Sequence, residues 1–107
     1  MTKAIDYYEL EPLFAHVKSF YGKAHVIEYL DDVLALQSYN TIVAVISPEG
    51  NLIIRDYYSP TTSRHIKEFA LQFAEDYSPS KSLKFYINSQ KFSEYNERNV
   101  SDALSVH

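Results

Sequence analysis

The sequence predicts an α+β fold: an antiparallel meander sheet of about four to five strands, with a long helix and one or two short helices packed on one face. Two observations support this prediction. Several consecutive strand-like stretches are separated only by short turn signals, and one later stretch has the apolar period of a helix. The 107 residues, 46% of them hydrophobic and 22% charged, suit a single globular domain over 1–107.

The long helix is the most strongly specified element. Ser59 or Thr61 can cap its N-terminus, and Pro60 suits the first helical position because it has a fixed φ and no N–H to leave unpaired. The helix is expected to reach Phe73 and to bury one apolar stripe. The stripe consists of Ile66, Phe69, Ala70, Phe73 and Tyr77.

The meander precedes this helix, and its turns are recognisable from their residues. Asp31-Asp32 predicts the first turn, Tyr39-Asn40 the second, with Asn able to take a positive φ, and residues 47–50 a type I turn closed by a bulge. Both faces of the third strand are apolar, which predicts a central strand covered on both sides. The strands are predicted over Lys23–Leu30, Val33–Ser38, Thr41–Ser47 and Leu52–Tyr58.

Three further elements are expected outside the meander. Apolar residues at helical spacing predict a short helix over Glu11–Phe20, ended by Gly22. The alternation in Leu83–Ile87 predicts an edge strand. Ser89 is expected to cap a last short helix with an inner face of Phe92, Tyr95 and Val100.

Composition narrows the function classes. The chain has no cysteine, which excludes disulfides and thiolate chemistry and favours the cytoplasm. We expect neither an export signal nor a membrane span, because no apolar run is long enough. The net charge of −4 disfavours a strongly electrostatic nucleic-acid binder, whereas ten tyrosines favour contacts with proteins.

Candidate binding residues gather at the start of the long helix. Thr61, Thr62, Arg64, His65 and Lys67 could receive an anion there, although the hydroxyl groups could equally serve only to cap the helix. Tyr39 at the second turn, and Tyr57 and Tyr58 before the helix, are the other candidates, because tyrosines left on a surface provide rigid contact area.

No catalytic residue, metal site or cofactor is predicted. The four histidines, His16, His25, His65 and His107, do not stand at the spacing of metal ligands. The adjacent acids Asp31-Asp32 and Glu75-Asp76 point to different faces and make no acid/base pair by themselves. We therefore expect a protein that is not an enzyme.

Three segments together carry a family resemblance: Ser-Phe-Tyr-Gly-Lys-Ala at 19–24, Leu-Gln-Ser-Tyr-Asn-Thr-Ile-Val-Ala at 36–44, and Tyr-Ser-Pro-Thr-Thr-Ser-Arg-His-Ile-Lys-Glu-Phe at 58–69. They resemble a small uncharacterised domain encoded by phages and other mobile elements of Gram-positive bacteria. The resemblance covers residues 19–73 and implies a mobile-element origin but no particular activity. Phe69-Ala70-Leu71-Gln72 departs slightly from the family's Phe-Leu-x-Gln pattern, which leaves the fold expectation unchanged.

Three functional hypotheses follow. The first is a cytoplasmic, non-enzymatic phage or mobile-element accessory protein that binds a host or phage protein through a tyrosine-rich acidic surface, with inhibition of a host defence system as one version. The second is a small nucleic-acid-binding module using Arg64, His65, Lys67 and Lys23. The third is a homo-oligomer formed through an uncovered sheet edge or face.

Overall fold

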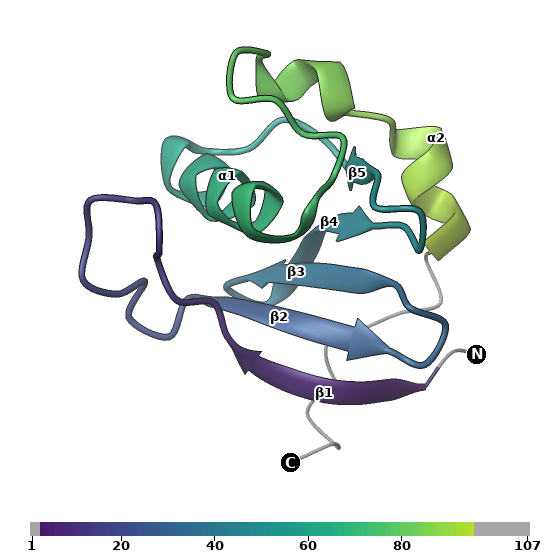
Figure 1. Ribbon diagram of the computed structural model, residues 1–107, viewed down its shortest axis with the longest axis horizontal. Helices are drawn as coiled ribbons and strands as arrows, with labels where there is room; N and C mark the ends of the chain where they lie inside the picture. Colours follow the sequence, from purple (N-terminus) through teal and green to yellow (C-terminus); the bar gives the residue numbers. More distant parts are fainter. Residues whose placement is uncertain (1–2, 96–107) are drawn as a thin grey trace.

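The computed structural model describes residues 3–95 and contains a five-stranded sheet in the order β1-β2-β3-β4-β5 (Figure 1). Every strand is antiparallel to its neighbours, so the predicted α+β fold with an antiparallel meander is confirmed. The strands are β1 Ala4–Glu9, β2 Ala24–Tyr29, β3 Leu34–Ser38, β4 Thr41–Ile46 and β5 Leu52–Ile54; the helices are α1 Pro60–Phe73, the 3₁₀ helix η1 Leu83–Tyr86, α2 Ser89–Phe92 and the 3₁₀ helix η2 Ser93–Tyr95.

The turns of the meander lie where their residue types predict them, but in one turn the positive φ falls on a different residue. At the β3–β4 turn the positive φ falls on Tyr39 (φ 58°) and not on Asn40, with Ser38 paired to Thr41 on either side. After β4, Gly50 has φ 91° and donates its N–H to Ser47 O at 2.9 Å, as the predicted type I turn requires. β5 ends at Ile54, four residues before the predicted end.

Helix α1 begins as its sequence predicts. Ser59 is the cap and its Oγ accepts from Thr62 N at 3.3 Å, while Pro60 occupies the first turn. The stripe residues Ile66, Phe69 and Ala70 are buried. Tyr77 lies beyond the end of α1, with its ring centroid 5.4 Å from that of Tyr86.

The two faces of the sheet carry separate apolar clusters, because alternate residues of each strand point to opposite sides. One cluster includes Val26 and Leu36 of the sheet together with the stripe of α1. The other includes Ile27 and Val45 together with Phe92 of α2. The prediction that the helices share one face is therefore not met by α2, which follows Asn88 at the β5 edge, where Asn88 N donates to Ile54 O at 2.9 Å.

Two predicted elements are wrong. Residues 11–20 form no helix. They follow β1 as a series of bends, and the N–H groups of Phe14 and Ala15 donate to the side chain of Glu68 in α1. Where an edge strand was predicted over Leu83–Ile87, Leu83–Tyr86 form η1, because Ser82 Oγ accepts from Lys84 N and starts a tight turn. Ile87 alone makes a parallel bridge, to Ile54.

The last helix is present but begins differently. The cap of α2 is Asn88, whose Oδ1 accepts from Lys91 N at 2.9 Å, and not Ser89. Phe92 is buried and Tyr95 packs against the same cluster, as expected for the inner face. Val100, the third predicted residue of that face, lies outside the described residues.

Candidate functional site

The three segments quoted for the family resemblance meet where α1 begins beside the end of β3. Ser38 Oγ lies 2.9 Å from His65 Nδ1 and 3.1 Å from Thr62 Oγ1. The rings of Phe20 and His65 meet edge to face with centroids 4.8 Å apart, and the Tyr39 ring is 6.1 Å from that of His65. Each segment contributes at least one residue to this contact set, which we call the His65 cluster.

The hydrogen-bonded centre of the His65 cluster is closed to solvent, whereas Tyr39 at its margin is exposed. Ser38 and Thr62 are buried and the His65 side chain is only 2% exposed. Burial lowers the pKa of His65, and the positive charges of Lys23 and Arg64 lower it further. A serine beside a neutral imidazole can act as a nucleophile and base, but here neither group is accessible, so the geometry supports a structural tie between α1 and β3.

Two tyrosines stand at the surface beside this cluster, and both have unusual backbone geometry. Tyr21 has φ 54° and Gly22 φ 72°, while Tyr39 has φ 58°. The two turns are joined because Tyr39 N donates to Lys23 O at 2.7 Å, and Lys23 Nζ lies 5.9 Å from the Tyr39 ring centroid. A positive φ at a tyrosine costs free energy and persists only where the surroundings hold it in place, so we infer that the joined turns fix the backbone at both exposed tyrosines.

The other predicted binding residues do not join the cluster. Thr61, Arg64 and Lys67 are exposed on α1. Tyr57 is exposed and Tyr58 is half-buried, and both line a pocket of 160 Å³ beside the start of α1. Of the predicted set, Thr62, His65 and Tyr39 belong to the His65 cluster, and Tyr57 and Tyr58 share the pocket.

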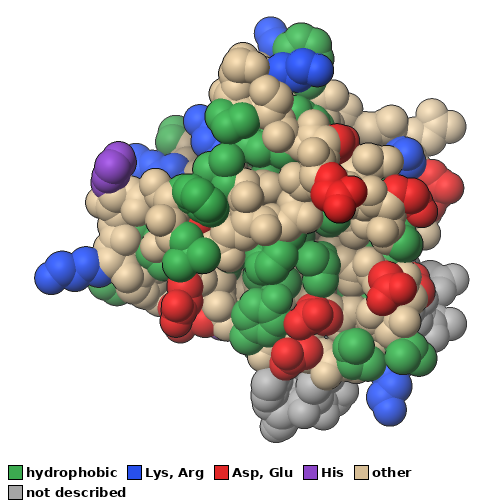
Figure 2. All heavy atoms as spheres, in the orientation of Figure 1, with side chains coloured by type: hydrophobic (Ala, Val, Ile, Leu, Met, Phe, Trp, Pro, Cys, Tyr) green, Lys and Arg blue, Asp and Glu red, His purple; other side chains and the backbone are tan. Residues whose placement is uncertain are grey.

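Charge is unevenly distributed over the face seen in Figure 2. Lysine and arginine side chains stand mainly at its upper and left margins, over η1, α1 and the connection between β1 and β2. Most acidic side chains lie lower and to the right. The surface around α1 therefore carries more positive charge than the net charge of the whole chain would suggest.

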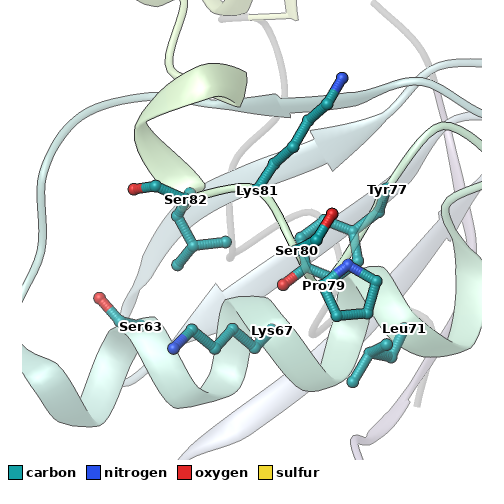
Figure 3. Close-up of a pocket in the computed structure, with 9 residues that line it drawn as sticks. Ser63, Lys67, Leu71, Tyr77, Pro79, Ser80, Lys81 and Ser82 are labelled. Atoms are coloured by element: carbon teal, nitrogen blue, oxygen red, sulfur yellow. The ribbon is translucent and has the colours of Figure 1, made fainter.

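A groove of 510 Å³ runs between α1 and the segment that follows it (Figure 3). Ser63, Lys67 and Leu71 line it from α1, and Tyr77 with residues 79–83 line it from the other side. The Lys67 side chain extends along α1 toward Ser63, whereas that of Lys81 points away from the helix. The smaller pocket shares Ser63 and residues 82–83 with this groove and continues it toward Tyr57 and Tyr58. We call the two together the lysine groove.

The connection between β1 and β2, residues 10–23, was not predicted as a binding site from the sequence. We call it the β1–β2 loop. Leu13 is 68% exposed and Tyr21 77%, and Phe14 and Val17 are also exposed. Leu10 and Phe20 are buried, so the loop is attached to the core near both ends. Four large apolar or aromatic side chains within nine residues thus face solvent.

The middle of the β1–β2 loop is attached to α1 by one buried carboxylate. Glu68 is 2% exposed, and its Oε1 accepts from Phe14 N at 3.0 Å and from Ala15 N at 2.8 Å. Gln72 Nε2 donates to Glu68 Oε2 at 2.7 Å and to Glu11 O at 2.6 Å. These bonds satisfy backbone groups that have no helix or strand to pair with.

The electrostatics of Glu68 agree with this role. Burial by itself raises the pKa of the carboxyl group, but the hydrogen bonds from Gln72 and from the backbone N–H groups of Ala15, Phe14 and Leu13 outweigh it, so the pKa is lowered. Glu68 is therefore ionised at neutral pH. In the sequence, Glu68 is distinguished only by standing four positions before Gln72, beside the apolar stripe. The same spacing is typical of a helix face exposed to solvent, so it does not predict burial.

Within residues 3–95, no group of three or more histidine, cysteine or acidic residues is placed to hold a metal ion. In the same part of the chain, no helix combines the length and apolar character needed to cross a membrane.

Residues 8–88 match a family of unknown function (DUF8033). The chain belongs to this family. The match includes the β1–β2 loop, the His65 cluster and the lysine groove, so the DUF8033 domain comprises all the candidate surfaces described above. Comparison with curated proteins and with solved structures found no match.

Proposed function

We propose that this DUF8033 chain is a protein-binding module whose contact surface centres on the β1–β2 loop. The observation that carries the proposal is the exposure of Leu13, Phe14, Val17 and Tyr21 on a loop that a buried carboxylate holds in place. Soluble domains rarely leave several large apolar side chains together in solvent without a use for them, and such residues are typical of binding sites.

The hydrogen bonds to Glu68 support the interpretation of the exposed β1–β2 loop as a binding surface and not merely an unstructured segment. A loop that is already held in one conformation loses little conformational entropy when a partner covers it, so more of the contact free energy appears as affinity. The positive φ at Tyr21 and Tyr39 has the same consequence for their rings. The contact surface is therefore prepared before binding.

The partner in this proposal is a protein of a bacterial host or of a phage. The chain acts without catalysis in the host cytoplasm as an accessory protein of a phage or mobile element, and inhibition of a host defence system is one version of this role. This role is supported by the resemblance of residues 19–73 to a domain of phages and mobile elements, by the acidic composition and by the lack of cysteine.

The nucleic-acid alternative loses one of its residues, because His65 is buried against Ser38. Arg64, Lys67 and Lys23 remain exposed. Homo-oligomers could also form through the apolar side chains of the β1–β2 loop. The experiment below is arranged to separate these alternatives from binding to another protein.

The test is affinity capture from a bacterial host lysate treated with nuclease, using the wild type, Leu13→Ser and Leu30→Ser. Leu30 is 67% exposed at the β2–β3 turn and so matches Leu13 in residue type and exposure. The proposal expects a discrete protein that is retained by the wild type and by Leu30→Ser and is lost with Leu13→Ser. Equal retention by both variants, or capture that disappears with nuclease, would contradict it.

Light scattering on the purified chain completes this experiment. A monomer at high concentration leaves the β1–β2 loop free for another protein. A dimer that Leu13→Ser converts to a monomer, while Leu30→Ser does not, would replace the proposed partner by a second copy of the chain.

A further inference from the structure

We propose that the lysine groove binds an acidic segment of the partner protein; this inference rests on the proposed function and specifies the chemistry of the partner. The starting observation is a local reversal of charge. Lys67, Lys81 and Lys84 line the groove, and Asp56 is the acidic residue among the lining side chains. The chain as a whole has a net charge of −4, so this is a basic site on an acidic protein.

The groove also provides hydrogen-bond donors suited to carboxylates. Ser63, Ser80 and Ser82 are among its lining residues, and the Ser80 hydroxyl already lies 2.8 Å from Ser78 Oγ. Ser82 Oγ accepts from Lys84 N at 3.4 Å and keeps its own proton for a ligand. Lysine ammonium groups together with hydroxyl donors can form charge-assisted hydrogen bonds to glutamate or aspartate side chains.

The wall opposite α1 is held in a defined conformation. Ser78 N donates to Tyr86 Oη at 2.9 Å, and Tyr86 Oη donates to Asp76 O at 3.3 Å. Lys81 N donates to Ser78 O at 3.0 Å, which closes a turn in the same segment. Lys81 Nζ lies 5.9 Å from the centroid of the Phe85 ring, and its side chain points away from α1 (Figure 3), so Lys67 and Lys84 are the lysines tested below.

The position of the groove connects it to the β1–β2 loop. Leu71 is exposed in the groove, and the next residue of α1, Gln72, bonds to Glu11 O in the loop. Figure 1 shows α1 lying between the loop and the segment that forms the other wall. One extended partner segment could place apolar side chains on the loop and acidic side chains in the groove.

An acidic peptide explains the groove better than a nucleic acid does. Phosphate backbones need many clustered cations, and here three lysines are accompanied by an aspartate on an acidic chain. Tyr57 and Phe85 are exposed nearby and could stack on bases, so single-stranded nucleic acid is the competing ligand to measure.

The probes are fluorescein-labelled deca-glutamate, deca-lysine and oligo-dT of about ten units, titrated with the full chain while anisotropy is measured. Only deca-glutamate is expected to bind. Its affinity should fall about tenfold or more between about 50 mM and about 300 mM salt, because exposed charges are screened. The double variant Lys67→Glu/Lys84→Glu should lose binding by at least about tenfold. Lys91→Glu, an exposed lysine of α2 outside the groove, is the matched control and should bind as the wild type does.

The proposal is overturned by absent binding of deca-glutamate, by stronger binding of oligo-dT, or by an equal loss with Lys91→Glu. Leu13→Ser separates the two proposals. It should leave deca-glutamate binding unchanged while abolishing capture of the partner. Capture that depends on Leu13 but is unaffected by Lys67→Glu/Lys84→Glu would leave the proposed function standing and remove this inference.

Discussion

His65 and Glu68 lie about one turn apart on α1 and are equally buried, yet they hold the chain in different ways. His65 is neutral and meets the side-chain hydroxyl of Ser38 at the end of a regular strand. Glu68 is ionised and accepts from backbone N–H groups of a segment without regular structure. A buried side chain can therefore have two roles. It can connect a helix to a strand that already has its own backbone hydrogen bonds, or it can supply the hydrogen bonds that an irregular segment lacks.

The largest effect is expected at Glu68. Glu68→Ala should destabilise the fold by about 2–4 kcal/mol, because it removes a buried charged acceptor and leaves partly buried backbone donors unpaired. Urea denaturation measures this loss, and amide hydrogen exchange at Phe14 and Ala15 should accelerate. Glu49→Ala, at an exposed glutamate in the β4–β5 turn, is the control and should stay within about 0.5 kcal/mol of the wild type. If Glu68→Ala were as stable as Glu49→Ala, the claim that Glu68 replaces missing backbone hydrogen bonds would be contradicted.

Ser38→Ala comes next, with an expected loss of about 1–3 kcal/mol. The substitution removes the partner of both His65 and Thr62 while leaving the strand and the helix their backbone bonds. Urea denaturation of Ser38→Ala beside Ser80→Ala, an exposed serine, measures the difference. Because Ser38 fastens elements that form locally, we expect it to cost less than Glu68→Ala, and the reverse order would contradict the distinction.

Lowering the pH should separate the two residues again. The pKa of His65 is lowered in the folded state, so below the ordinary value of 6.5 the unfolded chain binds more protons, and the stability due to neutral His65 is lost as the pH falls. Burial lowers the pKa of His25 as well, and it contributes in the same range. Glu68 contributes only at lower pH, because its folded pKa lies below 4.5 and its stabilisation is lost as the pH falls through that value.

Denaturant midpoints at about pH 7.5 and about pH 5.5 test the histidine part of this prediction. The loss of stability between them should shrink in His65→Gln and, separately, in His25→Gln. An unchanged pH dependence in both variants would show that neither imidazole controls stability in this range.

The smallest effect is expected at the tip of the β1–β2 loop. Leu13→Ser and Leu30→Ser should each change the free energy of unfolding by no more than about 0.5 kcal/mol, because both side chains are already exposed. Thermal or urea unfolding provides the measurement. A marked destabilisation by Leu13→Ser alone would mean that the leucine packs against the fold, and its loss of partner capture could then no longer be assigned to a contact surface.

The site could be predicted from the sequence only where its residues stand at local signals such as helix caps and turns. Thr62, His65 and Tyr39 were selected because they stand beside recognisable caps and turns, and the fold brings them together. Arg64 and Lys67 are close to them in the sequence but lie outside the cluster, because Arg64 is exposed and Lys67 lines the lysine groove. Sequence spacing places residues on a helix, but it does not say which neighbouring segment each side of that helix will meet.

The meander from β2 to β5 and helix α1 follow from the sequence alone. Their turn residues, apolar alternation and the Ser59 cap act over a few residues, so they can be recognised without knowing what packs against them. Three features depend on long-range packing instead: residues 11–20 form a loop, Leu83–Tyr86 form a 3₁₀ helix, and Phe92 packs on the opposite face of the sheet from α1.

The physical reason is the distance along the chain between the partners. Glu68 lies more than fifty positions from Phe14 and Ala15, and its hydrogen bonds satisfy the loop N–H groups that a helix would otherwise have paired internally. The apolar spacing of Leu10, Leu13, Phe14 and Val17 was real, but it marks side chains that the folded domain leaves exposed, apart from Leu10. A local pattern predicts structure only where no distant group offers the backbone a better partner.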